Sequence, residues 1–340
     1  MFNIYNNIMK TKKERIFYLD LLRTFAILVV ILYHIDVFFN PMAAQPILIF
    51  HMAFHDIARS SIPIFLMISG VLLLKRSYPS IPDFLKRRFA RIVYPFIFWI
   101  ILILVPLYLQ GCDAQSLWIF FIGEPSITWY FWTLIGIYLF MPVINPFIKE
   151  YGLKGVEYFL AIWFFTVILM TFNAYPLWTN FNLDMFASYI GYPLLGYWLV
   201  NKKFSLSDKK LCIIGFVILI IALGAHMFLH TNNQEFIRNM NINLPVVFMG
   251  VGLFLFIMSL DRLNKFDSVR NNSVGKAITS LSICSYGMYF SHTIVVNWLL
   301  PYNTQSNLLF PLMFAITVFL SWLLPYVLSK IPYIKKFSGV

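Results

Sequence analysis

The sequence predicts an all-α protein that crosses a membrane about ten times, with both termini in the cytoplasm. Hydrophobic residues make up 60% of the 340 residues, and charged residues only 12%. An ordinary soluble domain contains roughly 25% charged residues, so a water-soluble fold of this length would have too few polar groups to cover its surface. The apolar residues also occur in long blocks, near the ~20 residues that a membrane-spanning helix needs.

Ten apolar segments are long enough to be spans: residues 16–38, 52–74, 92–109, 128–146, 157–173, 184–200, 211–229, 245–260, 277–299 and 306–329. They form one transmembrane domain, 16–330, between cytoplasmic tails at 1–15 and 331–340. No secretory signal peptide is expected, because the first apolar segment is too long and contains charges. The odd number of scattered cysteines indicates no disulfide framework.

The basic residues fall on one side of this topology. Of the 26 Lys and Arg residues, 23 lie in the tails and in alternate loops, whereas the opposite loops hold only Arg238. The positive-inside rule therefore predicts cytoplasmic termini, an even number of spans and a multi-pass protein of the inner (cytoplasmic) cell membrane. Membrane orientation thus explains the net charge of +12. Membrane lipids are the expected neighbours, and nucleic acid is not an expected partner.

Three titratable residues lie in the first span, where each charge costs on the order of 3 kcal/mol and needs a partner or a function. Asp20 lies one turn before Arg23, close enough to pair with it. Arg23 and His34 lie within about 20° of the same helix face and ~16 Å apart along its axis. A structural interpretation is an interfacial anchor pair and a histidine that hydrogen-bonds another helix. The functional interpretation of His34 is a general base near neutral pH.

His51, His55 and Arg59 recur at every fourth residue of the second predicted span, so they share one face. Arg59 is the deepest of them and is expected to contact a polar or anionic substrate in a wet cavity. The alternative is an amphipathic helix entrance with Asp56 as a counter-ion. His51, His55 and Asp56 also have the spacing of part of a metal site. No further ligand is evident in the sequence, so no metal is predicted.

The densest basic cluster, KRRFARIVYPFIFW, begins the third span. The positive-inside rule alone explains Arg87, Arg88 and Arg91. Arginine also suits bidentate contacts with phosphates, so the same residues are candidates for holding a nucleotide cofactor. His292 lies in the middle of the ninth span. Like His34, it is either a histidine that hydrogen-bonds another helix or a functional residue.

This pattern resembles the acyltransferase 3 family of integral membrane acyltransferases. Asp20, Arg23 and His34 reproduce its L-D-x-x-R signature and its R-x(10)-H motif. Four further stretches are similar to the family in order: SIPIFLMISGVLLLKR, FLKRRFARIVYPFIFW, WYFWTLIGIYLFMPVI and LSICSYGMYFSH. The chain looks closest to small stand-alone members, of the type of the enterobacterial common antigen O-acetyltransferase. It departs from the family where fourth spans often begin H-L-W: Ile127 replaces the His, Trp129 remains, and the Glu that larger members carry after that Trp is missing.

The resemblance implies an acyl-CoA-dependent O-acyltransferase that modifies a hydroxyl of a cell-surface or lipid-linked glycan. Acetyl-CoA is the expected donor, and succinyl stays open as the acyl group. By this resemblance Arg87, Arg88 and Arg91 hold the CoA phosphates. Arg23, oriented by Asp20, steadies the cofactor along its channel.

His34 is then expected to deprotonate a sugar hydroxyl, or to carry the acyl group transiently. Arg59 is a candidate for stabilising the developing oxyanion. The residues expected to bind the substrate are Arg59, Ser69, His55, Trp129 and His292.

Two other functions stay open at this level. A polysaccharide or glycolipid exporter would also have Arg and His along a substrate path in the membrane. Many transporters contain internal repeats with interrupted helices, and the sequence shows no such symmetry. A non-catalytic partner of a glycan synthase is the second alternative. Binding of acyl-CoA by the purified protein would argue against both.

Overall fold

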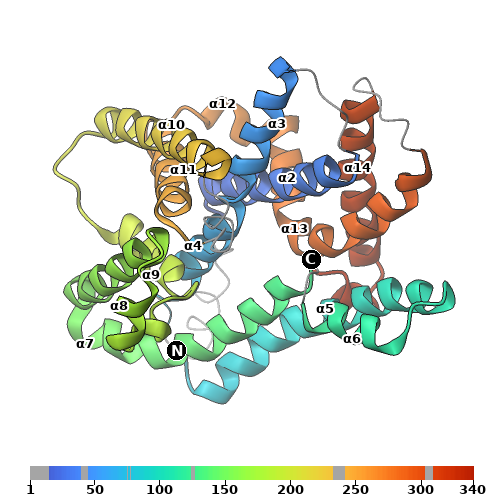
Figure 1. Ribbon diagram of the computed structural model, residues 1–340, viewed down its shortest axis with the longest axis horizontal. Coiled ribbons are helices and arrows are strands. Elements are labelled where there is room, and N and C mark those ends of the chain that lie inside the picture. Colours follow the sequence, from blue (N-terminus) through green and yellow to red (C-terminus); the bar gives the residue numbers. More distant parts are fainter. Residues whose placement is uncertain are drawn as a thin grey trace, which may run out of the picture.

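The computed structural model describes residues 15–39, 45–74, 76, 78–123, 127–232, 242–302 and 309–340. Some residues used in the predictions lie outside the described residues. They are the basic residues Lys10, Lys12, Lys13, Lys75 and Arg238, used for membrane orientation, and the side chain of His51. The described chain is mostly helical and contains no strand (Figure 1). The all-α prediction is confirmed for this part of the chain.

The helices in chain order are α2 (Phe17–Phe39), α3 (Gln45–Ala58), α4 (Ser61–Leu73), α5 (Ile81–Leu109), α6 (Ala114–Ile122), α7 (Trp129–Thr171), α8 (Tyr175–Asn180), α9 (Gly191–Asn201), α10 (Asp208–Asn232), α11 (Leu244–Arg262), α12 (Asp267–Arg270), α13 (Ser273–Leu299) and α14 (Leu309–Lys330). Short 3-10 turns are η1 (Leu183–Met185), η3 (Leu300–Tyr302) and η4 (Lys335–Phe337).

Seven segments of the described chain are long and apolar enough to cross a membrane. They are Phe17–Asp36, Met52–Leu73, Ile81–Leu109, Trp129–Thr171, Asp208–Asn232, Leu244–Arg262 and Phe310–Lys330. The long helix α7 is two helices that meet at Gly152, where φ is 58° and ψ is −145°. These segments indicate a membrane protein. The count of about ten spans and the cytoplasmic position of the termini stay predictions.

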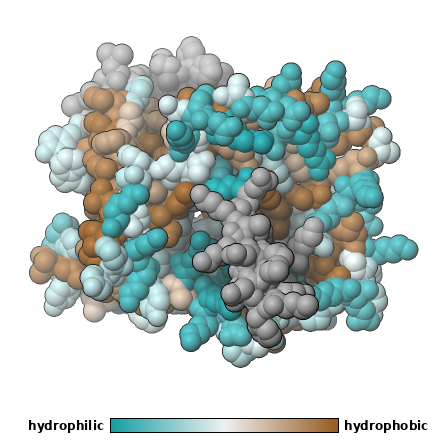
Figure 2. All heavy atoms as spheres, turned by 180° about the vertical axis from the view of Figure 1, so that it is seen from behind, coloured by the Kyte–Doolittle hydropathy of each residue, from teal (hydrophilic) through white to brown (hydrophobic). Residues whose placement is uncertain are grey.

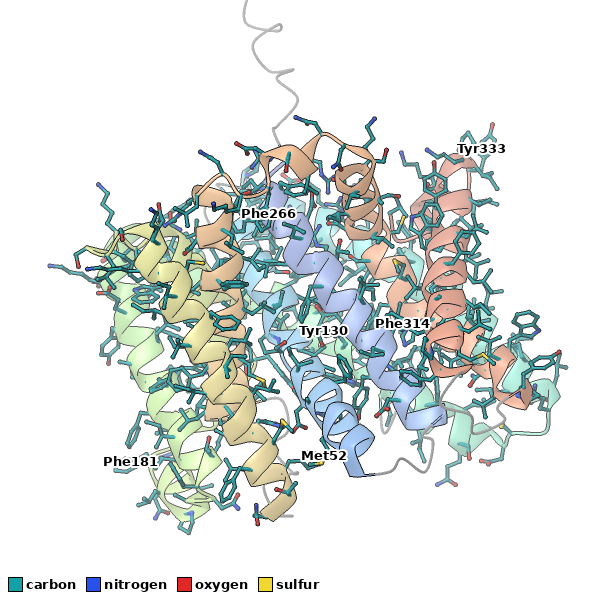
Figure 3. The ribbon with its side chains drawn as sticks, turned by 90° about the horizontal axis from the view of Figure 1, so that it is seen from above. Met52, Tyr130, Phe181, Phe266, Phe314 and Tyr333 are labelled. Atoms are coloured by element: carbon teal, nitrogen blue, oxygen red, sulfur yellow. The ribbon has the colours of Figure 1, made fainter. Side chains whose placement is uncertain are left out.

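Loops that the sequence assigns to opposite sides of the membrane lie at opposite edges of the bundle. Figure 3 shows Phe266 and Tyr333 at one edge, Met52 and Phe181 at the other, and Tyr130 between them. Figure 2 looks onto the first of these faces, where hydrophilic residues gather over much of the surface and around a hollow near its centre. Phe266 and Tyr333, from predicted inner segments, thus lie opposite Phe181, from a predicted outer loop, and the side of the membrane that each edge faces stays a prediction.

Helices α2 and α13 pack against each other, and both contact α14. Helix α2 also contacts α4 and α11, and α13 contacts α5. The α13 side chains of Ser282, Ser285, Ser291 and His292 are buried. Protein therefore surrounds the polar side of α13, which explains why this helix can be less apolar than a span that faces lipid. The two helices with the most specific family motifs thus lie together.

Two glycines allow α4 and α9 to cross in close contact. A Cβ on Gly70 would overlap the backbone of Pro193, and a Cβ on Gly196 would overlap the backbone of Met67. A larger residue at either position would force the two helices apart. The glycine of the SIPIFLMISGVLLLKR stretch therefore has a packing role.

The predicted span 52–74 is not one continuous helix. Helix α3 ends at Ala58 and α4 begins at Ser61, with Arg59 in the turn between them. The Arg59 amide donates to the carbonyl oxygen of Asp56, three residues back, at 3.1 Å, which is the spacing of a tighter 3-10 turn. Arg59 therefore lies outside the helix that carries His55, although both side chains contact Tyr33.

Residues of the predicted C-terminal tail pack back against the bundle. The η4 turn contacts α5 and α14. Ser338 is buried, and Nε1 of Trp99 donates to its carbonyl oxygen at 3.4 Å. Gly339 and Val340 line a large cavity.

Candidate active site

Two large cavities lie within the described part of the bundle, and they share Tyr289 as a common wall. The inner cavity, at the predicted cytoplasmic end of α2, has a volume of about 450 Å³. The outer cavity, at the other end of α2, has a volume of about 360 Å³. Arg23 lines the inner cavity and His34 lines the outer one. A single helix therefore contributes to both sites.

The charged side chains of the inner cavity are mostly positive. Among the described residues its lining contains five guanidinium groups and one carboxylate: Arg15, Arg23, Arg76, Arg88, Arg91 and Asp20. They come from the start of α2, the end of α4 and the start of α5. Such an excess of positive charge in a protein interior attracts anions, and arginine in particular suits phosphate oxygens.

Asp20 is bound by residues other than Arg23. Nε and NH2 of Arg15 donate to its two carboxylate oxygens at 2.9 and 2.6 Å, and Oγ of Ser282 donates to Oδ1 at 2.6 Å. The hydrogen bond with Asp20 raises the pKa of Arg15. The expected ion pair between Asp20 and Arg23 is therefore wrong, and among the described residues Arg23 pairs with no acidic group. Its charge is available to a ligand in the cavity.

The basic cluster at the start of α5 is divided between the cavity and the surface. Arg88 and Arg91 are three residues apart, so they share a helix face, and both line the inner cavity. Arg87 points elsewhere: its side chain is exposed and it is not part of the lining. Helical spacing alone could have separated it from the other two. Arg15 and Arg76, which sequence reasoning had assigned only to membrane orientation, are additional lining residues.

His34 has a defined tautomer in the outer cavity. Its Nδ1 lies 2.8 Å from the carbonyl oxygen of Val30. Because a carbonyl oxygen only accepts, this hydrogen bond assigns the proton to Nδ1 and leaves a lone pair on Nε2. Nε2 is therefore the atom that can take a proton from a hydroxyl group.

His292 lies beside His34, with the two ring centroids 4.8 Å apart. Its Nδ1 donates to the carbonyl oxygen of Met288 at 3.0 Å. The side chain is fully buried, and its Nε2 has no hydrogen-bond partner in the described chain. The outer cavity is therefore lined by two imidazoles that each keep a lone pair on Nε2. This pairing of α2 with α13 is a tertiary contact that the sequence pattern did not predict.

Arg59 and Trp129 also line the outer cavity. NH2 of Arg59 donates to the hydroxyl of Tyr33 at 3.2 Å, and the guanidinium lies 4.9 Å from the centre of the Tyr33 ring. The ring of Trp129 lies 5.7 Å from that of Tyr189. Sequence reasoning missed Tyr33, although it is the residue directly before His34.

Two residues expected beside Arg59 lie elsewhere. His55 is not part of the lining of either cavity; it packs on the outside of Tyr33, with ring centroids 4.7 Å apart. Ser69 lines the inner cavity, and its hydroxyl donates to the carbonyl oxygen of Phe65 at 3.0 Å. The break between α3 and α4 explains part of this difference, because residues before and after it do not continue one helical face.

Tyr289, from the SYGMYFSH stretch of α13, separates the arginines from the histidines. Its hydroxyl donates to the carbonyl oxygen of Ile127 at 2.8 Å, and its ring lies 5.3 Å from that of Tyr130. The backbone of Ile127, the residue at the departure from the H-L-W pattern noted above, thus holds the tyrosine. Sequence reasoning did not identify Tyr289 as a site residue.

A family model described as an acyltransferase domain, that of the acyltransferase 3 family, matches residues 16–326. The chain belongs to this family. The matched range contains Arg23, His34 and His292, and nearly all of the transmembrane bundle. No curated protein and no solved structure gives a significant match. Together with the seven apolar segments, the family identifies a membrane acyltransferase.

Proposed function

We propose that this protein transfers an acyl group, most simply acetyl, from cytoplasmic acyl-CoA to a hydroxyl of a cell-surface or lipid-linked glycan. The observation that carries the proposal is the pair of cavities on either side of Tyr289, one with arginines and one with His34 and His292. Coenzyme A has its phosphates and its sulfur at opposite ends of a long arm. Arg23 and His34 are ~16 Å apart along one helix, a separation that such an arm can span.

The inner cavity fits the donor in charge. Among the described lining residues, the guanidinium groups are accompanied by the one side-chain carboxylate of Asp20, which Arg15 and Ser282 already bind. Arg88 and Arg91 would hold the phosphates, and Arg23 would contact the part of the donor that reaches towards Tyr289. The adenine nucleotide would remain near the basic mouth.

The outer cavity supplies the groups for the transfer itself. Nε2 of His34 would accept the proton of the acceptor hydroxyl while its oxygen attacks the thioester carbon. A C–O bond forms, the C–S bond breaks, and the proton passes on to the sulfur of CoA. Arg59 would stabilise negative charge on the carbonyl oxygen. His292 would hydrogen-bond the acceptor through its Nε2.

The same Nε2 of His34 could attack the thioester first, with the sugar hydroxyl taking the acyl group in a second step. Rapid-quench experiments with radioactive acetyl-CoA separate the two routes. A labelled protein that loses its label on addition of an acceptor supports the two-step route, and an unlabelled protein supports direct transfer.

The proposal is tested first with the purified protein in detergent. Acetyl-CoA binding and slow hydrolysis, with water as the acceptor, would be compared for the wild type, Arg23→Ala and His34→Ala. We expect weaker binding in Arg23→Ala, and lost turnover with retained binding in His34→Ala. A folded wild type that neither binds nor hydrolyses acetyl-CoA would contradict the proposal and would favour the exporter.

A further inference from the structure

Away from both cavities, one carboxylate and three imidazoles join α3 to α10. Asp56 is fully buried. Nδ1 of His55 and Nδ1 of His230 lie 3.3 and 2.9 Å from its Oδ1, and Nδ1 of His226 lies 3.3 Å from its Oδ2. The rings of His55 and His230 are stacked, with centroids 5.3 Å apart. Asp56 and His230 are 174 residues apart in the sequence, so only the fold reveals this cluster.

A buried carboxylate needs a compensating positive charge, because an unpaired charge in a protein interior costs several kcal/mol. In the described chain the ion-pair partners of Asp56 are the three histidines. A neutral imidazole donates a hydrogen bond but brings no charge. A bound cation would supply that charge and would also use the nitrogen lone pairs of the imidazoles.

We infer that His55, Asp56 and His230 bind a divalent transition-metal ion, with Zn²⁺ the best match, and that His226 holds the carboxylate in place through its other oxygen. Imidazole nitrogen and carboxylate oxygen are ligands that Zn²⁺ takes in four-coordinate sites. The ligand atoms of His55, Asp56 and His230 lie within 4.8 Å of one another. The distances of 3.3 and 2.9 Å from Oδ1 of Asp56 to Nδ1 of His55 and of His230 are close to the ~3.3 Å between ligands around a tetrahedral zinc with bonds of about 2.0 Å. The sequence predicted no metal because α3 alone offers too few ligands.

Three protein ligands would leave one position of a tetrahedral zinc for water. None of the three ligands lines either cavity, so the inferred role of the ion is structural. The ion would clamp α3 to α10. It would also support the outer cavity, because His55 packs on Tyr33 and Tyr33 accepts a hydrogen bond from Arg59. The inference concerns metal binding and does not depend on the proposed acyl transfer.

Cobalt titration tests the inference, because Co²⁺ replaces Zn²⁺ in such sites and absorbs strongly in the visible range when tetrahedral. The full chain without a histidine tag would be stripped with a chelator and titrated with Co²⁺ and then Zn²⁺. We expect one equivalent of Co²⁺ with intense visible bands that Zn²⁺ abolishes. His55→Gln and His230→Gln should each weaken Co²⁺ binding by at least about tenfold, since even outer-shell changes have effects of that size.

The matched control is Asn232→Ala. Asn232 is exposed on α10, and its amide donates to the carbonyl oxygen of Phe228 and to the hydroxyl of Thr231. This variant should bind Co²⁺ as the wild type does. Absent binding by the folded wild type, or equal binding by the wild type and the His55→Gln/His230→Gln double variant, would overturn the inference.

X-ray absorption at the zinc edge gives a reading that needs no variant, in case the histidine substitutions impair folding. The zinc-loaded wild type should show two imidazole ligands together with an oxygen ligand. Zinc with one imidazole or none would also overturn the inference.

Discussion

The inner and outer cavities lie at opposite ends of α2, and their chemistry differs. In the part of the chain that the structure describes, five guanidinium groups and one side-chain carboxylate line the inner cavity, whereas one arginine, two histidines and several aromatic rings line the outer cavity. Fixed charges suit the binding of an anion, whereas an imidazole can accept and release a proton. This difference shows that one helix can supply one residue for binding the donor, Arg23, and another for the reaction at the acyl carbon, His34. Variants of the two cavities should therefore change different constants.

The largest effect is expected for His34→Gln. This change removes the Nε2 lone pair, so turnover of acetyl-CoA should fall by about 10²- to 10⁴-fold, the usual contribution of a general base. The dissociation constant for acetyl-CoA should stay at its wild-type value, because His34 lies outside the inner cavity. Release of the CoA thiol measures the turnover, and calorimetry measures the dissociation constant. Loss of acetyl-CoA binding in this variant would contradict the separate roles of the two cavities.

The Arg88→Gln/Arg91→Gln double variant should show the opposite pattern. Two charge-assisted hydrogen bonds to phosphate are lost, so the dissociation constant should rise by about 100-fold or more. Turnover at saturating acetyl-CoA should change little. Arg87→Gln is the matched control on the same turn of α5, and should behave as the wild type because Arg87 lies outside the cavity. An equal effect of all three arginines would mean that the surface charge alone matters.

Tyr289→Phe tests the shared wall. The substitution removes the hydrogen bond to the carbonyl oxygen of Ile127 and keeps the ring. A net contribution of about 1 kcal/mol for that bond corresponds to roughly a fivefold effect. We expect the affinity for acetyl-CoA and the turnover both to fall by about this factor. Tyr289 would then differ from the inner-cavity residues, which should change binding alone, and from the outer-cavity residues, which should change turnover alone. A change in turnover alone would assign Tyr289 to the outer cavity.

The smallest effect is expected from salt. Exposed charges at the mouth of the inner cavity are screened over about 10 Å at 0.1 M ionic strength, so binding of acetyl-CoA should weaken a few-fold at higher salt. Turnover at saturating acetyl-CoA should not change with salt, because the outer cavity relies on imidazoles rather than on an excess of fixed charge. Titrations at several salt concentrations measure both constants. Salt-independent binding would contradict the role of the arginines.

Local periodicity predicted α2 well. The structure confirms that this segment is one helix and that Arg23 and His34 both face the interior cavities. Their spacing in a regular helix was sufficient for that result. The break between α3 and α4 was missed, although Pro63 carried a signal for it. Proline has no amide hydrogen, so Pro63 cannot donate to the carbonyl of Arg59 four residues earlier.

Contacts between distant helices could not be predicted from local spacing. Asp20 was expected to bind Arg23 because they are one turn apart, but Ser282 of the distant helix α13 binds it in the fold, together with the nearby Arg15. In the same way, the pairing of His34 with His292 depends on how α2 packs against α13. Local spacing gives the face of a helix, whereas tertiary packing decides which residue meets it.

The central claim is that the donor enters from the arginine side of the bundle. The most direct test uses the protein in sealed vesicles with acetyl-CoA, which does not cross membranes, added only outside. Cys112 lies between α5 and α6, on the predicted outer side, whereas the second accessible cysteine, Cys212, lies at the predicted inner end of α10. In a Cys212→Ser background, an impermeant maleimide therefore reports the orientation of the protein through Cys112. Hydrolysis is predicted in vesicles where Cys112 is protected inside and absent where Cys112 is labelled. Hydrolysis of external acetyl-CoA by protein with Cys112 on the outside would contradict the account.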